Sequence, residues 1–299
     1  MQNFLLLGFC FVAGYLVRLT QRFPETTPKV LNSFIIYISL PALTLLYVQK
    51  LKIELELLMP ISMAWLLFGL AFIFFKLLGK RLNWQASTVA CLILVCGLGN
   101  TSFLGLPMIE VFWGKEGLPI GLIIDQLGSF MVLSTLGIFL AVKYGTSTNG
   151  KQNLVKEILT FPPFISVVAA LLLQSIDYPP IVFFTLERLG QTLTPLALFS
   201  VGFQLRFSHI NTHKLQLSVG LIFKLIAAPA VLFFIYSMLT PDRGLVFNVT
   251  IFEAAMPPMI TAAVLATEYK LNKDLAAILV GIGIVFSFVT LTLWWMILS

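Results

Sequence analysis

Long apolar stretches recur along the whole chain and are separated by short polar connections. Each stretch is close to the roughly 20 residues that a helix needs to cross about 30 Å of hydrocarbon. The stretches are too long for the roughly ten-residue alternating strands of a membrane barrel. The pattern therefore predicts an all-α integral membrane protein with ten transmembrane helices, at residues 4–20, 29–49, 58–77, 87–110, 117–142, 156–175, 186–205, 214–238, 245–267 and 274–298.

Polar, glycine and proline residues interrupt two of these apolar stretches. The fourth predicted span contains GLGNTSFLGLP at residues 97–107, and the ninth contains EAAMPP at residues 253–258. In a bilayer, such a break is tolerated only where protein or a water-filled cavity satisfies the freed backbone groups. We therefore expect both breaks to lie inside the helix bundle and away from lipid.

Composition and charge support the membrane assignment and set its orientation. The chain is 59% hydrophobic and only 11% charged, with a mean hydropathy of +0.97, whereas soluble proteins are about 25% charged. Thirteen Lys and Arg residues lie in odd-numbered connections, and five lie in even-numbered ones. This bias places the odd connections in the cytoplasm and both termini outside. The net charge of +6 is spread over the connections, which argues against a nucleic-acid partner; the expected surroundings are the lipid bilayer of the cell membrane.

An inverted repeat is the simplest organisation for ten spans. The most loop-like connection, residues 144–152, divides five spans from five, so the second half must enter the membrane from the opposite side. Pro41 and Pro195 lie 154 positions apart, and Gly128 and Gly283 lie 155 positions apart. This common offset supports two repeats, residues 1–143 and 155–299, within a single membrane domain.

Two breaks at corresponding positions of inverted repeats predict a binding site where two broken helices cross. The amino ends of the half-helices direct amide groups and positive dipole ends toward that point, which suits a carboxylate. Gly and Pro also produce ordinary kinks in membrane helices, but a matched pair favours a site. We predict substrate contacts from Asn100, Thr101, Ser102, Pro257, Pro258 and Thr261.

Ionisable residues within spans are costly and therefore suggest function. Glu253 and Asp125 each lie about eight residues into a predicted span, and Lys224 lies in the eighth span. Lys224 is predicted to attract an anionic substrate or to pair with a carboxylate; the alternative is that it extends to the membrane surface. A coupling Na⁺ or H⁺ is predicted at Glu253, Asp125, Gln126 and Ser129. No other cofactor and no metal are expected, since His209 and His213 have no evident third ligand.

Four segments resemble the auxin efflux carrier family. GLGNTSFLGLPMIEVFWGKEG is similar to the fourth span of that family, and AAMPPMITAAVLATEYKLNKDLAA is similar to its ninth. Residues 39–43 and 195–199 resemble its second and seventh spans. The resemblance implies crossing broken helices with Asn100 and Pro257 at the crossing, as in the fold of the bile acid symporters. It also implies a scaffold of spans 1, 2, 6 and 7, a transport part of spans 3, 4, 5, 8, 9 and 10, and a possible homodimer through the scaffold.

The function predicted from these features is secondary transport of a small organic anion by elevator-type alternating access. The resemblance implies a carboxylate such as malonate, malate or an auxin-like acid. The chain contains no GxxxxGK[ST] motif, which argues against an ATP-driven pump. Two alternatives are a membrane sensor that binds the same anion without moving it and a membrane enzyme acting on a lipid-like substrate. The enzyme is disfavoured because the spans contain no His and no Asp-rich motif.

Overall fold

A computed structural model describes residues 2–50, 55–146, 159–174, 176–205, 213–240 and 243–299. This part of the chain is almost entirely helical. The first half contains α1 (Gln2–Leu19), α2 (Thr27–Phe34), α3 (Leu40–Tyr47), α4 (Leu58–Arg81), α5 (Ala86–Cys96), α6 (Leu106–Ile123), α7 (Phe130–Val132) and α8 (Ile138–Tyr144). The second half contains α10 (Pro162–Leu172), α11 (Pro180–Gln191), α12 (Leu193–Gln204), α13 (Lys214–Ile222), α14 (Ala228–Leu239), α15 (Leu245–Ala254), α16 (Ile260–Glu268) and α17 (Lys273–Leu298).

Short turns of other helix types connect several of these elements. The π-helical turns are η1 (Ile35–Ser39), η4 (Thr101–Gly105), η5 (Ile124–Ser129), η6 (Leu133–Gly137) and η8 (Phe223–Ala227), and the 3₁₀ turns are η2 (Val48–Lys50) and η3 (Leu55–Leu57). Six of the candidate residues lie in π-helical turns: Thr101, Ser102, Asp125, Gln126, Ser129 and Lys224. Such turns within helices occur frequently at functional sites.

The predicted apolar stretches coincide with helical segments of the described chain. Five segments are long and apolar enough to cross a membrane by length and composition: Thr27–Lys50, Leu55–Arg81, Thr101–Tyr144, Lys214–Leu239 and Lys273–Leu298. Among the described residues, Gly8–Leu19, Ala86–Cys96, Pro162–Leu172 and Leu245–Ala254 are shorter apolar helices, two of which end where the breaks divide the fourth and ninth stretches. The seventh stretch begins earlier than predicted, at Pro180, because α11 includes the apolar residues before Glu187. His209 and most of the dividing connection lie outside the described residues.

The chain reverses direction within α6, at Gly114. This residue has φ 66° and ψ −163°, and a positive φ is accessible to glycine at little cost. The side chain of Ile109, before the turn, contacts the backbone positions of Gly117 and Gly121 after it. In a straight helix Ile109 and Gly121 would be about 18 Å apart at 1.5 Å per residue, so the two parts of α6 form a hairpin. The turn falls between the predicted fourth and fifth spans.

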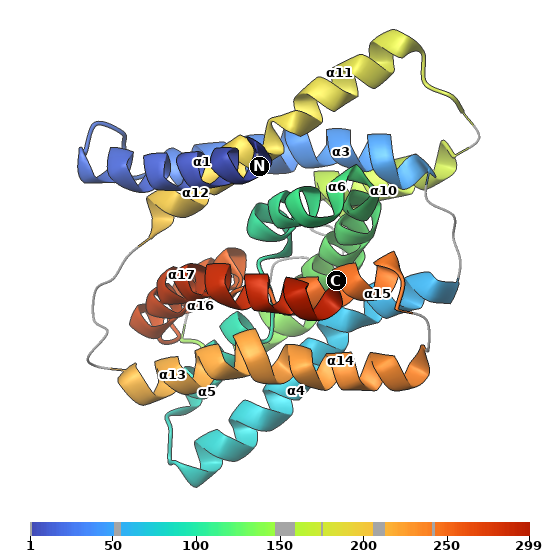
Figure 1. Cartoon of the computed structure of the whole chain (residues 1–299). Coiled ribbons are helices and arrows are strands. Elements are labelled where there is room, and N and C mark those ends of the chain that lie inside the picture. Colours follow the sequence, from blue (N-terminus) through green and yellow to red (C-terminus); the bar gives the residue numbers. More distant parts are fainter. Residues whose placement is uncertain (1, 51–54, 147–158, 175, 206–212, 241–242) are drawn as a thin grey trace.

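The helices form two groups, which Figure 1 shows above and below α6. In the first group α1 and α2 pack against α12, and α3 packs against α10 and α11. In the second group α4 packs against α5, α14 and α15, and α17 packs against α5, α13 and α16. Helix α6 contacts α15 of the second group and α12 and α3 of the first. Residues on α6 are therefore placed to join the two groups.

Candidate functional site

The two interrupted helices meet at their breaks. Helix α5 ends at Cys96 and η4 begins at Thr101, while α15 ends at Ala254 and α16 begins at Ile260. Between these ends, Gly99 and Pro258 form an isolated antiparallel bridge. All residues of both breaks are buried. We call this place the crossing, made of residues 97–105 and 253–260.

Each break supplies hydrogen-bond partners for the other. The backbone N–H of Asn100 donates to the carbonyl of Pro257 over 2.9 Å, and the N–H of Met259 donates to the carbonyl of Leu98 over 3.2 Å. An unpaired backbone group in a bilayer costs several kcal/mol. The cross-bonds therefore explain how two breaks persist in the buried core of the bundle.

The amino ends of both following helices are without side-chain caps. Asn100 is the N-cap residue of η4, and Met259 is the N-cap residue of α16. Neither side chain accepts a capping hydrogen bond. The first backbone bond in η4 runs from the N–H of Gly105 to the carbonyl of Asn100. The earlier N–H groups of the turn point along the axis toward the crossing, where a positive partial charge develops.

Two side chains at the crossing hold buried polar atoms that have no hydrogen-bond partner among the described residues. Asn100 is 1% exposed, and its amide nitrogen Nδ2 is unpaired. Glu253 is 0% exposed, and both of its carboxylate oxygens are unpaired. A buried unpaired polar group costs about 1–3 kcal/mol, more if it is charged, and such groups are rare in proteins. A donor and two acceptors of this kind at one place are suited to bind a ligand and an ion.

Glu253 lies between elements from both halves of the chain. Its Oε1 is 2.4 Å from the position that a Cβ atom would take on Gly105 and 3.7 Å from the equivalent position on Gly121. The absence of side chains there makes room for the carboxylate. Lys224, also 0% exposed, donates from Nζ to the carbonyl of Ala254 over 2.7 Å. Its charge therefore lies at the carboxyl end of α15, where a cation is favoured, and within electrostatic range of Glu253.

Asp125 binds the hydroxyl group of Thr101, which follows Asn100. Thr101 Oγ1 donates to Asp125 Oδ1 over 2.6 Å. The structure thus brings together residues that the sequence assigned to two different roles. In this arrangement a carboxylate of the protein itself binds the Thr101 hydroxyl, which was predicted to contact substrate.

The remaining predicted residues are divided between the core and the surface. Gln126 is buried and donates from Nε2 to Thr44 Oγ1 over 2.8 Å, while its Oε1 has no partner in the described chain. Ser129 is buried, and its hydroxyl is likewise unpaired there. Pro257 and Pro258 lie in the crossing. Thr261, by contrast, is exposed, so the structure does not place its side chain with the buried cluster.

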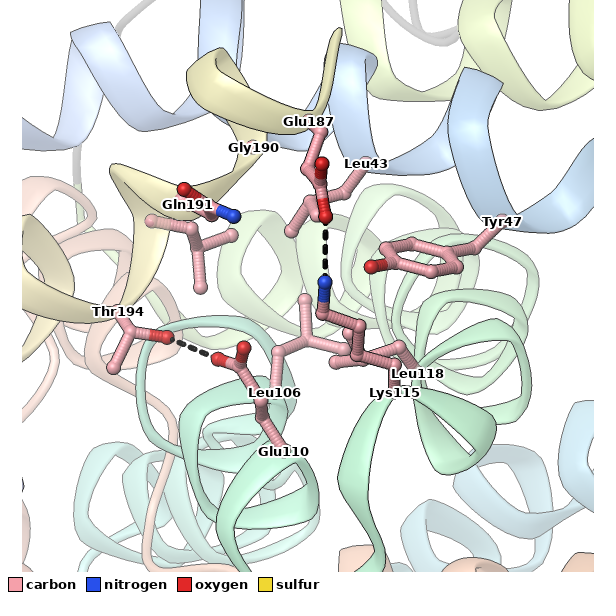
Figure 2. Close-up of a pocket in the computed structure, with 11 residues that line it drawn as sticks. Leu43, Tyr47, Leu106, Glu110, Lys115, Leu118, Glu187, Gly190, Gln191 and Thr194 are labelled. Atoms are coloured by element: carbon pink, nitrogen blue, oxygen red, sulfur yellow. Dashed lines mark hydrogen bonds and ion pairs between the residues drawn. The ribbon is translucent and has the colours of Figure 1, made fainter. Parts of the chain in front are cut away.

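A second polar region joins α6 to the first helix group, as Figure 2 shows. Lys115 Nζ donates to Glu187 Oε1 over 2.6 Å, and Thr194 Oγ1 donates to Glu110 Oε2 over 2.8 Å. The ring of Tyr47 lies beside the ion pair. The hydrogen bond that Lys115 donates to Glu187 raises the pKa of Lys115, which keeps the ammonium charged. We call Tyr47, Glu110, Lys115, Glu187 and Thr194 the interface cluster.

Sequence reasoning did not identify the interface cluster as a unit. Lys115 and Glu187 are 72 positions apart, and Glu110 and Thr194 are 84 apart. The one available signal was that Glu110 and Lys115 are charged residues flanking the turn at Gly114. Thr44, which binds Gln126, carried no signal beyond being a hydroxyl residue within an apolar stretch.

The long apolar helices around a buried polar crossing define a multi-pass protein of the cell membrane. The chain belongs to the membrane transport protein family, whose family model matches residues 1–295, and which is the family of the auxin efflux carriers that the fourth and ninth stretches resemble. It is therefore a membrane transporter.

Two archaeal relatives are similar over almost their full lengths. A protein of Methanocaldococcus jannaschii named as an uncharacterized transporter is 28% identical over 298 residues, which cover 96% of each chain. A protein of Methanothermobacter thermautotrophicus with the same description is 26% identical over 288 residues, covering 95% of this chain and 94% of the relative.

Proposed function

We propose that the protein is a secondary transporter that moves a small organic anion across the membrane, with the crossing as its substrate site. The observation that carries this proposal is the unpaired, buried amide nitrogen of Asn100, located at the uncapped amino end of η4 and held against the second break. A carboxylate is the ligand that complements such a donor together with two positive helix ends. Lys224 adds a full positive charge nearby.

The charges at the crossing argue for a cation that travels with the anion. Asp125, Glu253 and Lys224 together carry a net charge of −1 when all three are ionised, which opposes entry of an anion. One proton or one Na⁺ on Glu253 removes that excess. Both oxygens of Glu253 are unpaired among the described residues, whereas Asp125 already accepts a hydrogen bond from Thr101. We therefore assign the coupling ion to Glu253 and a positioning role to Asp125.

The donors left for the substrate are fewer than the sequence suggested. With the hydroxyl of Thr101 bound to Asp125, the remaining donors include the amide of Asn100 and the backbone N–H groups at the starts of η4 and α16. Contact of the substrate with the Thr101 hydroxyl requires Asp125 to release it. Protonation of Asp125 weakens its hydrogen bonds because the neutral group is the poorer acceptor.

The proposed movement uses the two helix groups. We assign the group containing α1, α3, α10 and α12 to a scaffold and the other group, with α6, to a transport part. This grouping fits ten spans in a five-plus-five inverted repeat with both termini outside, and a dimer formed through the scaffold. The polar contacts of the interface cluster cross the boundary between the parts. Lys115 and Glu187 lie in or beside even-numbered connections, so their ion pair closes the outer side in this proposal.

Thermal stabilisation of the purified protein by ligands tests the site. Malonate, malate, indole-3-acetate and simple amines are compared with and without Na⁺, on the original chain and on Asn100→Ala. A ligand that binds only the folded protein raises the midpoint by mass action, by about 2.7 kcal/mol in stability at 100 times its Kd. We expect stabilisation by one class of acid that is lost in Asn100→Ala and retained in Asn248→Ala, a matched change on α15 outside the crossing. Stabilisation by amines alone, or an undiminished shift in Asn100→Ala, contradicts the proposal.

Flux measurements in liposomes separate transport from its alternatives. The original chain is expected to exchange the stabilising acid across the bilayer, with a rate that depends on pH or Na⁺. Glu253→Gln is expected to lose that dependence. Binding without flux identifies a sensor, and chemical conversion of the acid identifies an enzyme.

A further inference from the structure

A groove separate from the crossing opens between α4 and α5, near the connection that joins them. It has a volume of about 180 Å³. Helix α4 contributes Lys76 and Lys80, Trp84 lies at the turn between the helices, and Tyr144 closes the groove from the end of α8. Neither the crossing nor the interface cluster shares a residue with this groove. Its residues are therefore not explained by the proposed transport site.

The groove combines an apolar floor with a cationic rim. Lys76 and Lys80 are four residues apart, so they lie on one face of α4. Opposite them, α5 contributes the small residues Ala86 and Ala90 in the same spacing, which leaves space between the helices. Lys76 Nζ lies 5.0 Å from the centre of the Phe72 ring. This arrangement fits a ligand that is both anionic and partly apolar.

The rim carries positive charge that acidic side chains do not neutralise. Within the described part of the chain, neither Lys76 nor Lys80 forms an ion pair with Asp or Glu. Arg81 and Lys143 lie at the same end of the bundle, directly beside Lys80 and Tyr144 in the sequence. This is the end at which the excess of Lys and Arg gathers, so it faces the cytoplasmic leaflet by the positive-inside rule.

The surface of α4 beside the groove is suited to contact lipid. Ile73 is 59% exposed and Leu77 is 66% exposed, and both lie on α4 next to the lysines. Exposed apolar residues at this position face hydrocarbon in a membrane protein. Trp84 and Tyr144 belong to the residue types that concentrate at the level of lipid head groups. The cationic rim thus matches the head group of a phospholipid, and the adjoining apolar surface of α4 matches its acyl chains.

We propose that this groove binds an anionic phospholipid of the cytoplasmic leaflet. The head-group phosphate is held by the ammonium groups of Lys76 and Lys80, and the acyl chains lie along the exposed side of α4. Basic pockets between helices on this side of a membrane bind lipid head groups through the same chemistry. The bound lipid would fasten α4 to α5, the first half of an interrupted helix.

Native mass spectrometry of the full chain tests this proposal directly. The protein is exposed to equal amounts of phosphatidylglycerol and phosphatidylcholine with identical acyl chains, and the bound lipids are counted. Each lysine near an anionic membrane surface is expected to favour the anionic lipid by about fivefold. We expect a clear preference for phosphatidylglycerol that is lost in the Lys76→Gln, Lys80→Gln double variant. The matched control, Lys29→Gln with Lys214→Gln, removes two exposed lysines from the first turns of α2 and α13 and is expected to keep the preference.

A second variant and a competitor define the result that would overturn the proposal. Ala86→Phe fills the groove without changing charge and is expected to reduce bound phosphatidylglycerol, while inorganic phosphate at millimolar concentration is expected not to displace it. Equal binding of the two lipids by the original chain, or an unchanged preference in the double variant, overturns the proposal. Complete displacement by inorganic phosphate also overturns it, since the groove then binds a soluble phosphate. The thermal midpoint in phosphatidylcholine alone verifies that each variant is folded.

Discussion

The crossing and the interface cluster are both polar regions inside a largely apolar protein, but their hydrogen bonds differ. At the crossing, Asn100 Nδ2 and both oxygens of Glu253 have no partner within the described chain. In the interface cluster, Lys115 is paired with Glu187, and Thr194 is paired with Glu110. Unpaired buried groups are suited to receive something from outside, whereas paired groups hold two parts of the protein together. The contrast therefore separates a binding role from a closing role.

The largest effect is expected at the crossing from Lys224→Met. The substitution removes the partner of the Ala254 carbonyl and the positive charge nearest to Glu253. Removing one member of a buried charged group costs about 3–5 kcal/mol. We expect a much lower thermal midpoint and no stabilisation by organic acids. Lys214→Met, at the exposed start of the same helix, is the control and is expected to change neither; equal behaviour of the two variants would mean that Lys224 is not part of the site.

A smaller but specific effect is expected from Gly105→Ala. The new Cβ atom would lie 2.4 Å from Glu253 Oε1, so the carboxylate must move within a buried space. Overpacking of this kind costs about 1–3 kcal/mol. We expect a moderate loss of stability and a larger loss of the Na⁺ or pH dependence of flux. Gly69→Ala is the control, because a Cβ atom there meets nothing within 4 Å. An ion dependence that survives Gly105→Ala argues against Glu253 as the ion site.

The interface cluster is expected to affect rate instead of stability. The side chain of Lys115 is 53% exposed and that of Glu187 is 26% exposed, and ion pairs this accessible contribute about 0–1 kcal/mol. We expect Lys115→Gln and Glu187→Gln to change the rate of anion exchange by up to about fivefold while the ligand-induced thermal shift stays constant. The charge-swapped double variant Lys115→Glu, Glu187→Lys should restore the original rate. Additive effects of the two single changes, measured as a double-mutant cycle, would show that the pair does not act as a unit.

The smallest effect is expected from Thr261→Val. This residue was predicted to contact substrate, but its side chain is exposed in the structure. We expect no change in ligand-induced stabilisation and a change in stability within about 0.5 kcal/mol. A loss of binding comparable to that in Asn100→Ala would return Thr261 to the site and extend the crossing toward α16.

The sequence was sufficient to predict features that depend on local chemistry. Both breaks were located, since Gly99, Asn100, Pro257 and Pro258 disrupt helical hydrogen bonding wherever they occur. The helical segments were also located closely, because long apolar runs have few structural alternatives in a membrane. The early start of the seventh segment, at Pro180, was not predicted, although a proline is common at the first position of a helix.

The pairings of side chains were beyond the reach of sequence. That Asp125 binds Thr101, and that Gln126 binds Thr44, depends on contacts 24 and 82 positions apart. Successive side chains of a helix point about 100° apart around its axis. A rotation of the helix by that angle is enough to move Thr261 from the core to the surface. The order of residues alone does not set that rotation; the packing of neighbouring helices does.

The mutual hydrogen bonds at the crossing have a consequence for how the protein is made. The N–H of Asn100 requires the carbonyl of Pro257, and the carbonyl of Leu98 requires the N–H of Met259. At a synthesis rate of about 5–20 residues per second, the later partners leave the ribosome on the order of 10 s after the earlier ones. During that interval the first break lies in the membrane, and the backbone N–H of Asn100 and carbonyl of Leu98 have no partner from the second break. Biogenesis must therefore pass through an intermediate whose first half depends on water, the insertion machinery or a chaperone until the second half arrives.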